Sequence, residues 1–304
     1  MKMVIVALFL ITSAFLLAQT IYFSPALDLV LTVYSPFFEM RPSRPNEIGL
    51  FQVPGKSSTL QVVSISASGF NDLNSFAKLL GAQLIGAEEL AVMNFWLGSQ
   101  EFFYRRFSIS SQKSEGIQMI FLRSGKGYIL TYYSSFEEFW QHLVPALLTM
   151  TSLRISEKPQ VYLNTDHNYT VKLMGPFVAV TPARGEIGAF ATHVEGKRGY
   201  VQIVKENLPR KISLEEYSNL VERNTLMKLA GYKLFSTGVN YVEGIDYAWR
   251  IFEFERTNEK YRCIQAYTIV ETVAYTITYI AKEQDFDFFL PAAVYIAFSF
   301  KPIW

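Results

Sequence analysis

The sequence contains one pattern of residues twice, and the second copy begins 140 positions after the first, where Pro36-Phe37 recurs as Pro176-Phe177. The motif YILTY, which starts at Tyr128, recurs as YTITY from Tyr275. Further matched segments are Glu47-Ile48-Gly49 with Glu186-Ile187-Gly188, Leu60 to Val63 with Val201 to Val204, Phe139 with Phe286, Pro145 with Pro291, and Ser152 with Ser299. The constant order and slowly drifting spacing indicate a duplication with small insertions in loops, so one fold is expected twice.

The chain length suits two units. Of the 304 residues, half are hydrophobic, and two units of about 130 residues each are close to the commonest domain size, so each can bury a core. Residues 156–168 are polar, contain Pro159, and are expected to form a linker. The predicted organisation is therefore a first unit at 19–155, a linker at 156–168 and a second unit at 169–304.

The N-terminus has the layout of a secretory signal. Met1-Lys2 precedes an apolar run at residues 3–17, and Ala18-Gln19 offers a small residue for cleavage. We therefore expect a signal peptide at 1–18 and a periplasmic or secreted protein. Leu16 is larger than the residue preferred at the −3 position, so an uncleaved N-terminal membrane anchor remains an alternative, as does a buried first helix of a cytosolic protein.

The pattern of each unit predicts strands, a capped helix, several antiparallel strands and a closing helix, which is an α+β plan. Ser213 and Glu216 form a capping box that starts a helix in the second unit. In the first unit, Asn71 or Asp72 is expected to cap the matching helix, which carries Phe76, Leu79 and Leu80. The closing helices are expected at residues 136–148 and 286–298, packed on the sheets.

The second unit resembles the PsbP-like superfamily. The resemblance lies in the capped helix after a hairpin, the Gly231-Tyr232 step into a strand, the strand from Tyr275, and a closing helix that ends Ala297-Phe298-Ser299-Phe300. This superfamily includes the extrinsic PsbP subunit of photosystem II, a Ran-binding import factor and bacterial envelope proteins. The resemblance implies two tandem units, each an antiparallel sheet in an α/β/α sandwich that serves as a docking surface. It carries over no catalytic residue.

Residues with catalytic or ligand-binding chemistry are sparse. His142, His167 and His193 have no metal-binding spacing, so neither a metal nor another cofactor is expected. Cys263 sits in a strand-like alternation typical of a buried thiol. Asp285 and Asp287 stand at a helix start, where capping is favoured over acid–base catalysis. The net charge of +1 argues against nucleic acid as a partner.

These observations favour a non-catalytic binding or structural module of the cell envelope that docks a protein partner. The alternatives are a carrier of a hydrophobic small ligand and a hydrolase with its site between the units. Grooves between packed domains are favoured ligand sites, so the partner surface is expected along the face between the units. Polar residues near that face are Lys197, Arg198, Asp166 and His167.

Overall fold

The computed structural model describes residues 19–24, 29–42, 44–70, 72–153 and 160–303. The predicted signal at 1–18 lies outside the described residues, so cleavage and export stay predictions. In the part of the chain that is described, every helix is too short or too polar to cross a membrane.

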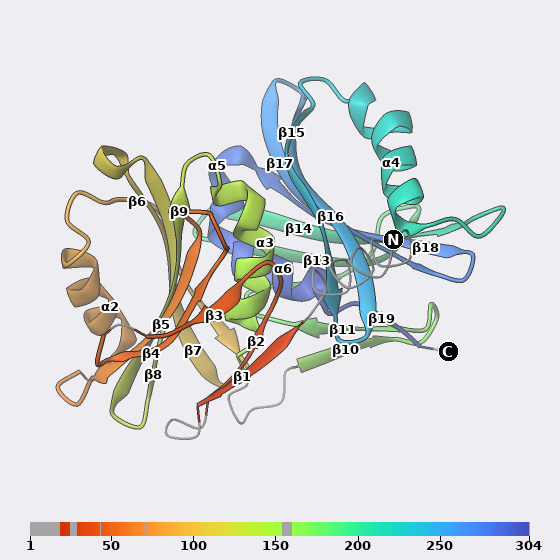
Figure 1. Ribbon diagram of the computed structural model, residues 1–304. Coiled ribbons are helices and arrows are strands. Elements are labelled where there is room, and N and C mark those ends of the chain that lie inside the picture. Colours follow the sequence, from red (N-terminus) through yellow and green to blue (C-terminus); the bar gives the residue numbers. More distant parts are fainter. Residues whose placement is uncertain (1–18, 25–28, 43, 71, 154–159, 304) are drawn as a thin grey trace, which may run out of the picture.

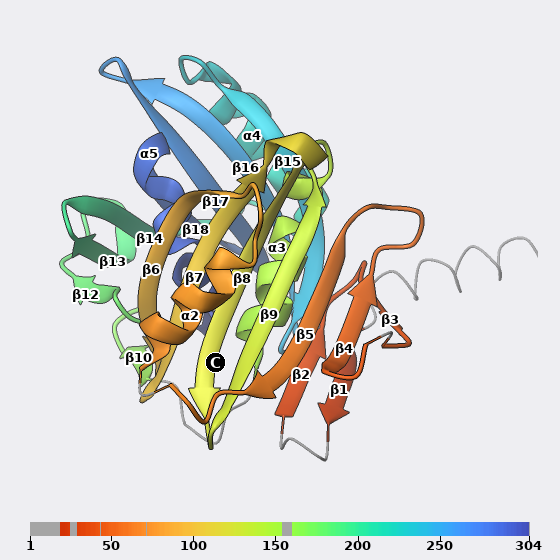
Figure 2. The same cartoon turned by 90° about the vertical axis from the view of Figure 1, so that its left-hand side faces the viewer.

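Two seven-stranded antiparallel sheets dominate the structure, and their strands follow the same order (Figures 1 and 2). The motifs YILTY and YTITY lie in the fourth strand of each sheet, which confirms that the two halves are similar. The first sheet runs β3 (Phe38–Met40), β4 (Glu47–Gln52), β5 (Thr59–Ser66), β9 (Lys126–Ser135), β8 (Ser114–Arg123), β7 (Gln100–Ile109), β6 (Glu88–Leu97). The second runs β12 (Val178–Val180), β13 (Glu186–Val194), β14 (Lys197–Asn207), β18 (Val273–Lys282), β17 (Glu259–Val270), β16 (Ile245–Arg256), β15 (Lys233–Val242).

The correspondence between the halves extends to single hydrogen bonds. The Tyr132 hydroxyl donates to the carbonyl of Phe139 at 2.8 Å, and the Tyr279 hydroxyl donates to that of Phe286 at 2.8 Å. Each bond ties the central strand to the start of the closing helix. Other matched features are the register shifts at Glu47/Gly49 and Glu186/Gly188, and the cis peptide bonds Ser35–Pro36 and Gly175–Pro176.

One capped helix covers the outer face of each sheet (Figure 2 shows the first). Helix α2 (Leu73–Ala82) begins at Asp72, whose Oδ1 accepts from the backbone N of Ser75 at 2.7 Å. Helix α4 (Leu214–Asn224) begins at Ser213, whose hydroxyl accepts from the N of Glu216 at 3.0 Å. Both predicted N-cap residues are confirmed, but the Glu216 carboxylate of the predicted capping box pairs with Arg210 at 2.7 Å. Of the apolar residues that α2 carries, Phe76 and Leu80 are buried against the sheet, whereas Leu79 is 48% exposed.

The closing helices lie between the two sheets (Figure 1). The first is α3 (Phe139–Thr151); the second is broken into α5 (Glu283–Phe286), the 3₁₀ turn η4 (Asp287–Phe289) and α6 (Leu290–Phe298). Pro291 lies in the first turn of α6, where its missing N–H costs no hydrogen bond. The antiparallel sheets with separate helices confirm the α+β class. A separate α/β/α sandwich in each half is not established, because α3 packs on α6 within one apolar core that both halves share.

Each half opens with a hairpin, and this corrects the expected linker. The hairpins are β1 (Thr20–Ser24) with β2 (Leu29–Val33), and β10 (Gln160–Asn164) with β11 (Tyr169–Leu173), which also pairs with β19 (Lys301–Pro302). Part of the segment predicted as a linker at 156–168 is thus a strand. The short apolar run Val161, Tyr162 and Leu163 was the available signal, since such residues favour strands. In the structure, the Tyr162 ring packs edge-on against Phe190 at 5.2 Å, while its two neighbours are exposed.

Candidate binding groove between the two halves

A groove of about 680 Å³ lies between α3 of the first half and strand β15 of the second. The first half forms one wall with Gln141, His142 and Pro145 of α3 and with Ser35 and Pro36, which follow its opening hairpin. The opposite wall is formed by Leu234, Phe235, Ser236, Thr237, Gly238, Val239, Asn240 and Trp249. The two halves therefore build this site together.

The wall formed by β15 presents the edge of the strand. Residues 234–240 line the groove one after another, whereas a strand that turned one face to a groove would contribute only alternate residues. β15 is the last strand of its sheet, with β16 on its other side. Alternate backbone N–H and C=O groups of such an edge strand point away from the sheet and remain available for pairing.

A short polar chain fixes one end of the groove across the boundary between the halves. Asn240 is 4% exposed; its Nδ2 donates to the carbonyl of Ser35 at 3.2 Å. Its Oδ1 accepts from Nε1 of Trp249 at 2.8 Å. Because these buried polar groups satisfy one another, the edge of β15 is held at a defined separation from the first half.

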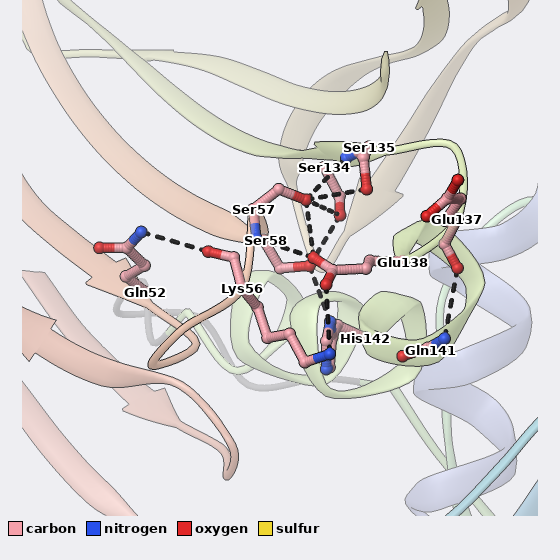
Figure 3. A network of polar contacts seen from close by, with 10 residues as sticks. All are labelled: Gln52, Lys56, Ser57, Ser58, Ser134, Ser135, Glu137, Glu138, Gln141 and His142. Atoms are coloured by element: carbon pink, nitrogen blue, oxygen red, sulfur yellow. Dashed lines mark hydrogen bonds and ion pairs between the residues drawn. The ribbon is translucent and has the colours of Figure 1, made fainter. Parts of the chain in front are cut away.

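A network of serines lies behind the α3 wall (Figure 3). Nδ1 of His142 is 2.7 Å from the hydroxyl of Ser58, which is also 2.7 Å from that of Ser134. Beside this pair, the Ser57 hydroxyl donates to Glu138 at 2.7 Å, and Glu138 forms an ion pair with Lys56 at 3.3 Å. These contacts join the loop before β5, the end of β9 and the first turns of α3.

The network orients His142 and exposes no nucleophile to the groove. The Ser58 side chain is fully buried, so its hydroxyl cannot reach a bound molecule. Burial lowers the pKa of His142, Lys56 lowers it further, and Glu138 partly opposes this. The ring is therefore neutral near pH 7. Among the described residues no hydrogen-bond partner faces its Nε2, so the ring can offer one polar atom to a ligand.

His142 predicts a loss of stability in acid. Because its pKa is lower in the folded chain than the usual 6.5, the unfolded chain binds a proton first as the pH falls. The contribution of neutral His142 to the free energy of unfolding is complete above about pH 6.5. It declines below that pH, by at most about 1.4 kcal/mol per pH unit. Urea unfolding between pH 7.5 and 5, with the exposed His167→Gln variant as control, measures this slope. A His142→Gln variant with the same slope as the native chain would contradict it.

A buried cluster of arginines and aromatic rings joins the halves beside the groove. Arg106 of β7 forms ion pairs with Glu115 in its own half and with Asp287 in the other. The ring of Trp140 lies between two guanidinium groups, 4.8 Å from that of Arg106 and 5.1 Å from that of Arg262. The capping role predicted for Asp287 was therefore wrong, because this carboxylate pairs across the boundary.

The four residues predicted as a partner surface lie away from the groove lining. Lys197 starts β14 with its ammonium 4.2 Å from the ring centre of Phe288, and the backbone N of Arg198 donates to Asp285 at 3.1 Å. Asp166 and His167 are exposed in the turn between β10 and β11. A partner surface at these residues stays a prediction. The expected exposure of His193 and burial of Cys263 are confirmed.

Sequence reasoning missed His142, Ser58 and the edge of β15. The serine doublets Ser57-Ser58 and Ser134-Ser135 were the available signal. They lie close together because β5 pairs with β9. Which strand forms the edge that faces α3 depends on how the halves pack, and no local pattern reports that.

No family model matches the sequence, and no curated protein matches it. Among solved structures, the PsbP of the cyanobacterium Synechocystis is 13% identical with a TM-score of 0.36, over 47% of this chain and 91% of that one. LpqN of Mycobacterium tuberculosis, described as involved in cell envelope biogenesis, is 8% identical with a TM-score of 0.40, over 48% and 91%. The immunity protein TplEi of Pseudomonas aeruginosa is 12% identical with a TM-score of 0.26, over 88% and 97%. A PsbP structure is thus among the solved structures that are similar to part of this chain.

Proposed function

We propose that this protein is a non-catalytic binding module that docks an extended segment of a protein partner in the groove, where the segment pairs with the edge of β15. The observation that carries this proposal is the row of consecutive residues 234–240 along one wall of the groove. Addition of a strand to an exposed sheet edge is a recurrent way to bind peptides: backbone hydrogen bonds supply affinity, and flanking pockets supply selectivity.

The groove suits an uncharged segment of a few residues. Seven strand residues extend over about 20 Å at ~3.3 Å per residue. The lining contains no aspartate, glutamate, lysine or arginine among the described residues, and His142 is neutral near pH 7. Leu234, Val239 and Pro145 provide apolar contacts, while the exposed Gln141 and Thr237 provide polar ones. A charged partner side chain would lose its hydration here without gaining an ion pair.

The two alternative functions have weaker support. A carrier of a hydrophobic ligand needs an enclosed apolar cavity, whereas this groove has polar groups on both walls. A hydrolase between the halves needs a nucleophile within reach of the substrate, and the one hydroxyl that contacts His142, that of Ser58, is fully buried. Docking of a partner requires neither feature.

We further propose that docking takes place outside the cytoplasm, in the cell envelope or beyond it. The support is the signal-like sequence at residues 1–18. An intact mass of the native protein that corresponds to a start at Gln19 would support export with cleavage, whereas a full-length species in the cytosol would contradict it.

Blocking the groove is expected to weaken peptide binding. Heptapeptides are first selected from a displayed library for binding to the full chain. They should bind the Gln141→Trp variant at least about tenfold more weakly than the native chain, which is a loss of about 1.4 kcal/mol in binding free energy. The reason is that Gln141 is exposed on the groove wall, so a tryptophan there occupies the groove. The matched control is Gln160→Trp, at an exposed site on β10. Calorimetry measures both affinities.

Strand pairing makes a second demand on the same peptides. Only alternate backbone N–H groups of an added strand face the sheet, so N-methylation of one alternating set should abolish binding while the other set is tolerated. Equal tolerance of both sets would contradict strand addition. Loss of binding in a Lys197→Glu/Arg198→Glu variant, with Gln141→Trp unaffected, would instead place the partner at the surface predicted from the sequence.

A further inference from the structure

Each half contains a buried arginine that anchors its outer helix to the sheet. Arg105 of β7 and Arg250 of β16 are each 1% exposed. Nη2 of Arg105 donates to the carbonyl of Ala77 in α2 at 2.5 Å, and Nη2 of Arg250 donates to that of Ser218 in α4 at 2.8 Å. Ala77 and Ser218 are both the fifth residue after the cap. The two arginines therefore have the same structural role, which makes their remaining contacts directly comparable.

The counter-ions of the two arginines differ. Nη1 of Arg250 is 3.1 Å from a carboxylate oxygen of Glu222, on the ninth residue after the cap of α4. The ninth residue after the cap of α2 is Gly81, and a Cβ built there would overlap Nη1 of Arg105. Arg105 instead pairs at 3.1 Å with Glu89 from β6, whose side chain is 50% exposed. The first half thus lacks the carboxylate that the second half carries on its helix.

A pocket of about 630 Å³ lies where that carboxylate is missing. Its charged lining residues are Arg105, Lys78 and Glu89, and Gly81, Leu84, Ala87 and Phe103 form the apolar part. Nε of Arg105 is buried and has no hydrogen-bond partner among the described residues, and the same holds for Nε of Arg250, so the difference between the halves lies in the carboxylate beside Nη1. Burial lowers the pKa of Arg105, and the pairing with Glu89 only partly offsets this. In the second half, the hydroxyl of Tyr232 contacts Glu222 at 2.9 Å beside Arg250.

We propose that this pocket binds a small carboxylic acid, whose carboxylate contacts Arg105 as Glu222 contacts Arg250. Nη1 of the guanidinium would bind the carboxylate by a charge-assisted hydrogen bond, and the half-exposed Glu89, which now accepts from Nη1, can swing away to admit it. An apolar tail of the ligand would lie against Leu84, Ala87 and Phe103. This site is separate from the groove, so it stands or falls independently of the proposed function.

Titration of the full chain with acetate, propionate and butyrate at constant ionic strength tests the proposal. Saturable binding is expected, with affinity rising by about fourfold for each added methylene group as the tail covers apolar surface. Inorganic phosphate and chloride are the comparison anions. Binding of phosphate as tight as that of butyrate, or no saturable response to any of the three acids, would overturn the assignment.

Two substitutions test the place of binding. Gly81→Glu supplies the missing carboxylate from the helix itself and should abolish binding, while circular dichroism confirms that the chain remains folded. Should this variant fold poorly, Ala87→Phe fills the pocket from the opposite side and should have the same effect. Glu89→Gln removes the competing carboxylate and should tighten binding several-fold, whereas the exposed neighbour Glu88→Gln should not. Unchanged affinity in the filled variants would overturn the proposal.

Discussion

Replacing Arg106 by alanine is expected to lower the free energy of unfolding by about 3–5 kcal/mol, the range for breaking a buried ion pair from one side. Arg106 is 4% exposed and pairs with Glu115 and with Asp287, whose side chains are 17% and 15% exposed. Without the guanidinium, two largely buried carboxylates remain close together with no positive charge between them. Their hydration is not restored, so the folded state bears the whole penalty.

The guanidinium is held in its charged form by these partners. Burial alone would lower the pKa of Arg106, but the carboxylates of Asp287 and Glu115 outweigh burial and raise it. The same group stacks on Phe139 at 5.0 Å and on Trp140 at 4.8 Å, which adds cation–π attraction to the ion pairs. Urea unfolding followed by tryptophan fluorescence and by circular dichroism measures the loss.

Two comparison variants make this prediction specific. Arg184→Ala removes an exposed arginine and should change stability by no more than about 0.5 kcal/mol. The double variant Arg106→Met/Asp287→Leu removes the pair across the boundary together, so it should lose less than the sum of its single variants. A loss below about 1 kcal/mol in Arg106→Ala would mean that the halves do not depend on this contact.

Much of the fold was predictable because it depends on short local patterns, and the repeat presents each of these patterns twice. The caps at Asp72 and Ser213 and the central strands that begin near Tyr128 and Tyr275 depend on short patterns, and all four are where the patterns place them. The break in the second closing helix was not predicted, although Pro291 inside the expected helix at 286–298 was a signal for it, because a proline starts a helix more readily than it continues one. The break places Asp287 against Arg106, and this contact exists only once the halves are packed.

The candidate sites were less predictable, since both depend on differences between the halves. The edge strand β15 contacts α3 beside the groove, and its Tyr241 carbonyl accepts a hydrogen bond from the side chain of Gln19. The matching edge strand, β6, contacts η4 and accepts a backbone hydrogen bond at Trp96 from Gly175. Similarly, Gly81 indicates a site only when it is compared with Glu222, the residue at the matching position of α4. A repeat search finds what the copies share, whereas these sites lie where the copies diverge.

Unfolding of the two halves is expected to be a single transition, because their cores are continuous. Buried residues of both sheets and of both closing helices belong to one apolar cluster. Phe139 and Phe286 occupy matched positions, each 0% exposed, and their ring centres lie 5.4 Å and 6.4 Å from that of Trp140. A cavity made in either helix therefore removes contacts on which the other half also depends.

Phe139→Ala and Phe286→Ala should each lower stability by about 3–5 kcal/mol, the usual result of truncating a buried phenylalanine. If the halves unfold as one unit, each variant should raise hydrogen exchange in both central strands, β9 and β18, to a similar degree. The exposed Phe38→Ala, on the short edge strand β3, is the control and should leave exchange in both nearly unchanged. Faster exchange in β9 alone for Phe139→Ala, and in β18 alone for Phe286→Ala, would show two independent folding units. The groove between α3 and β15 would then open and close without unfolding, and peptide affinity would depend on how often the halves are apposed.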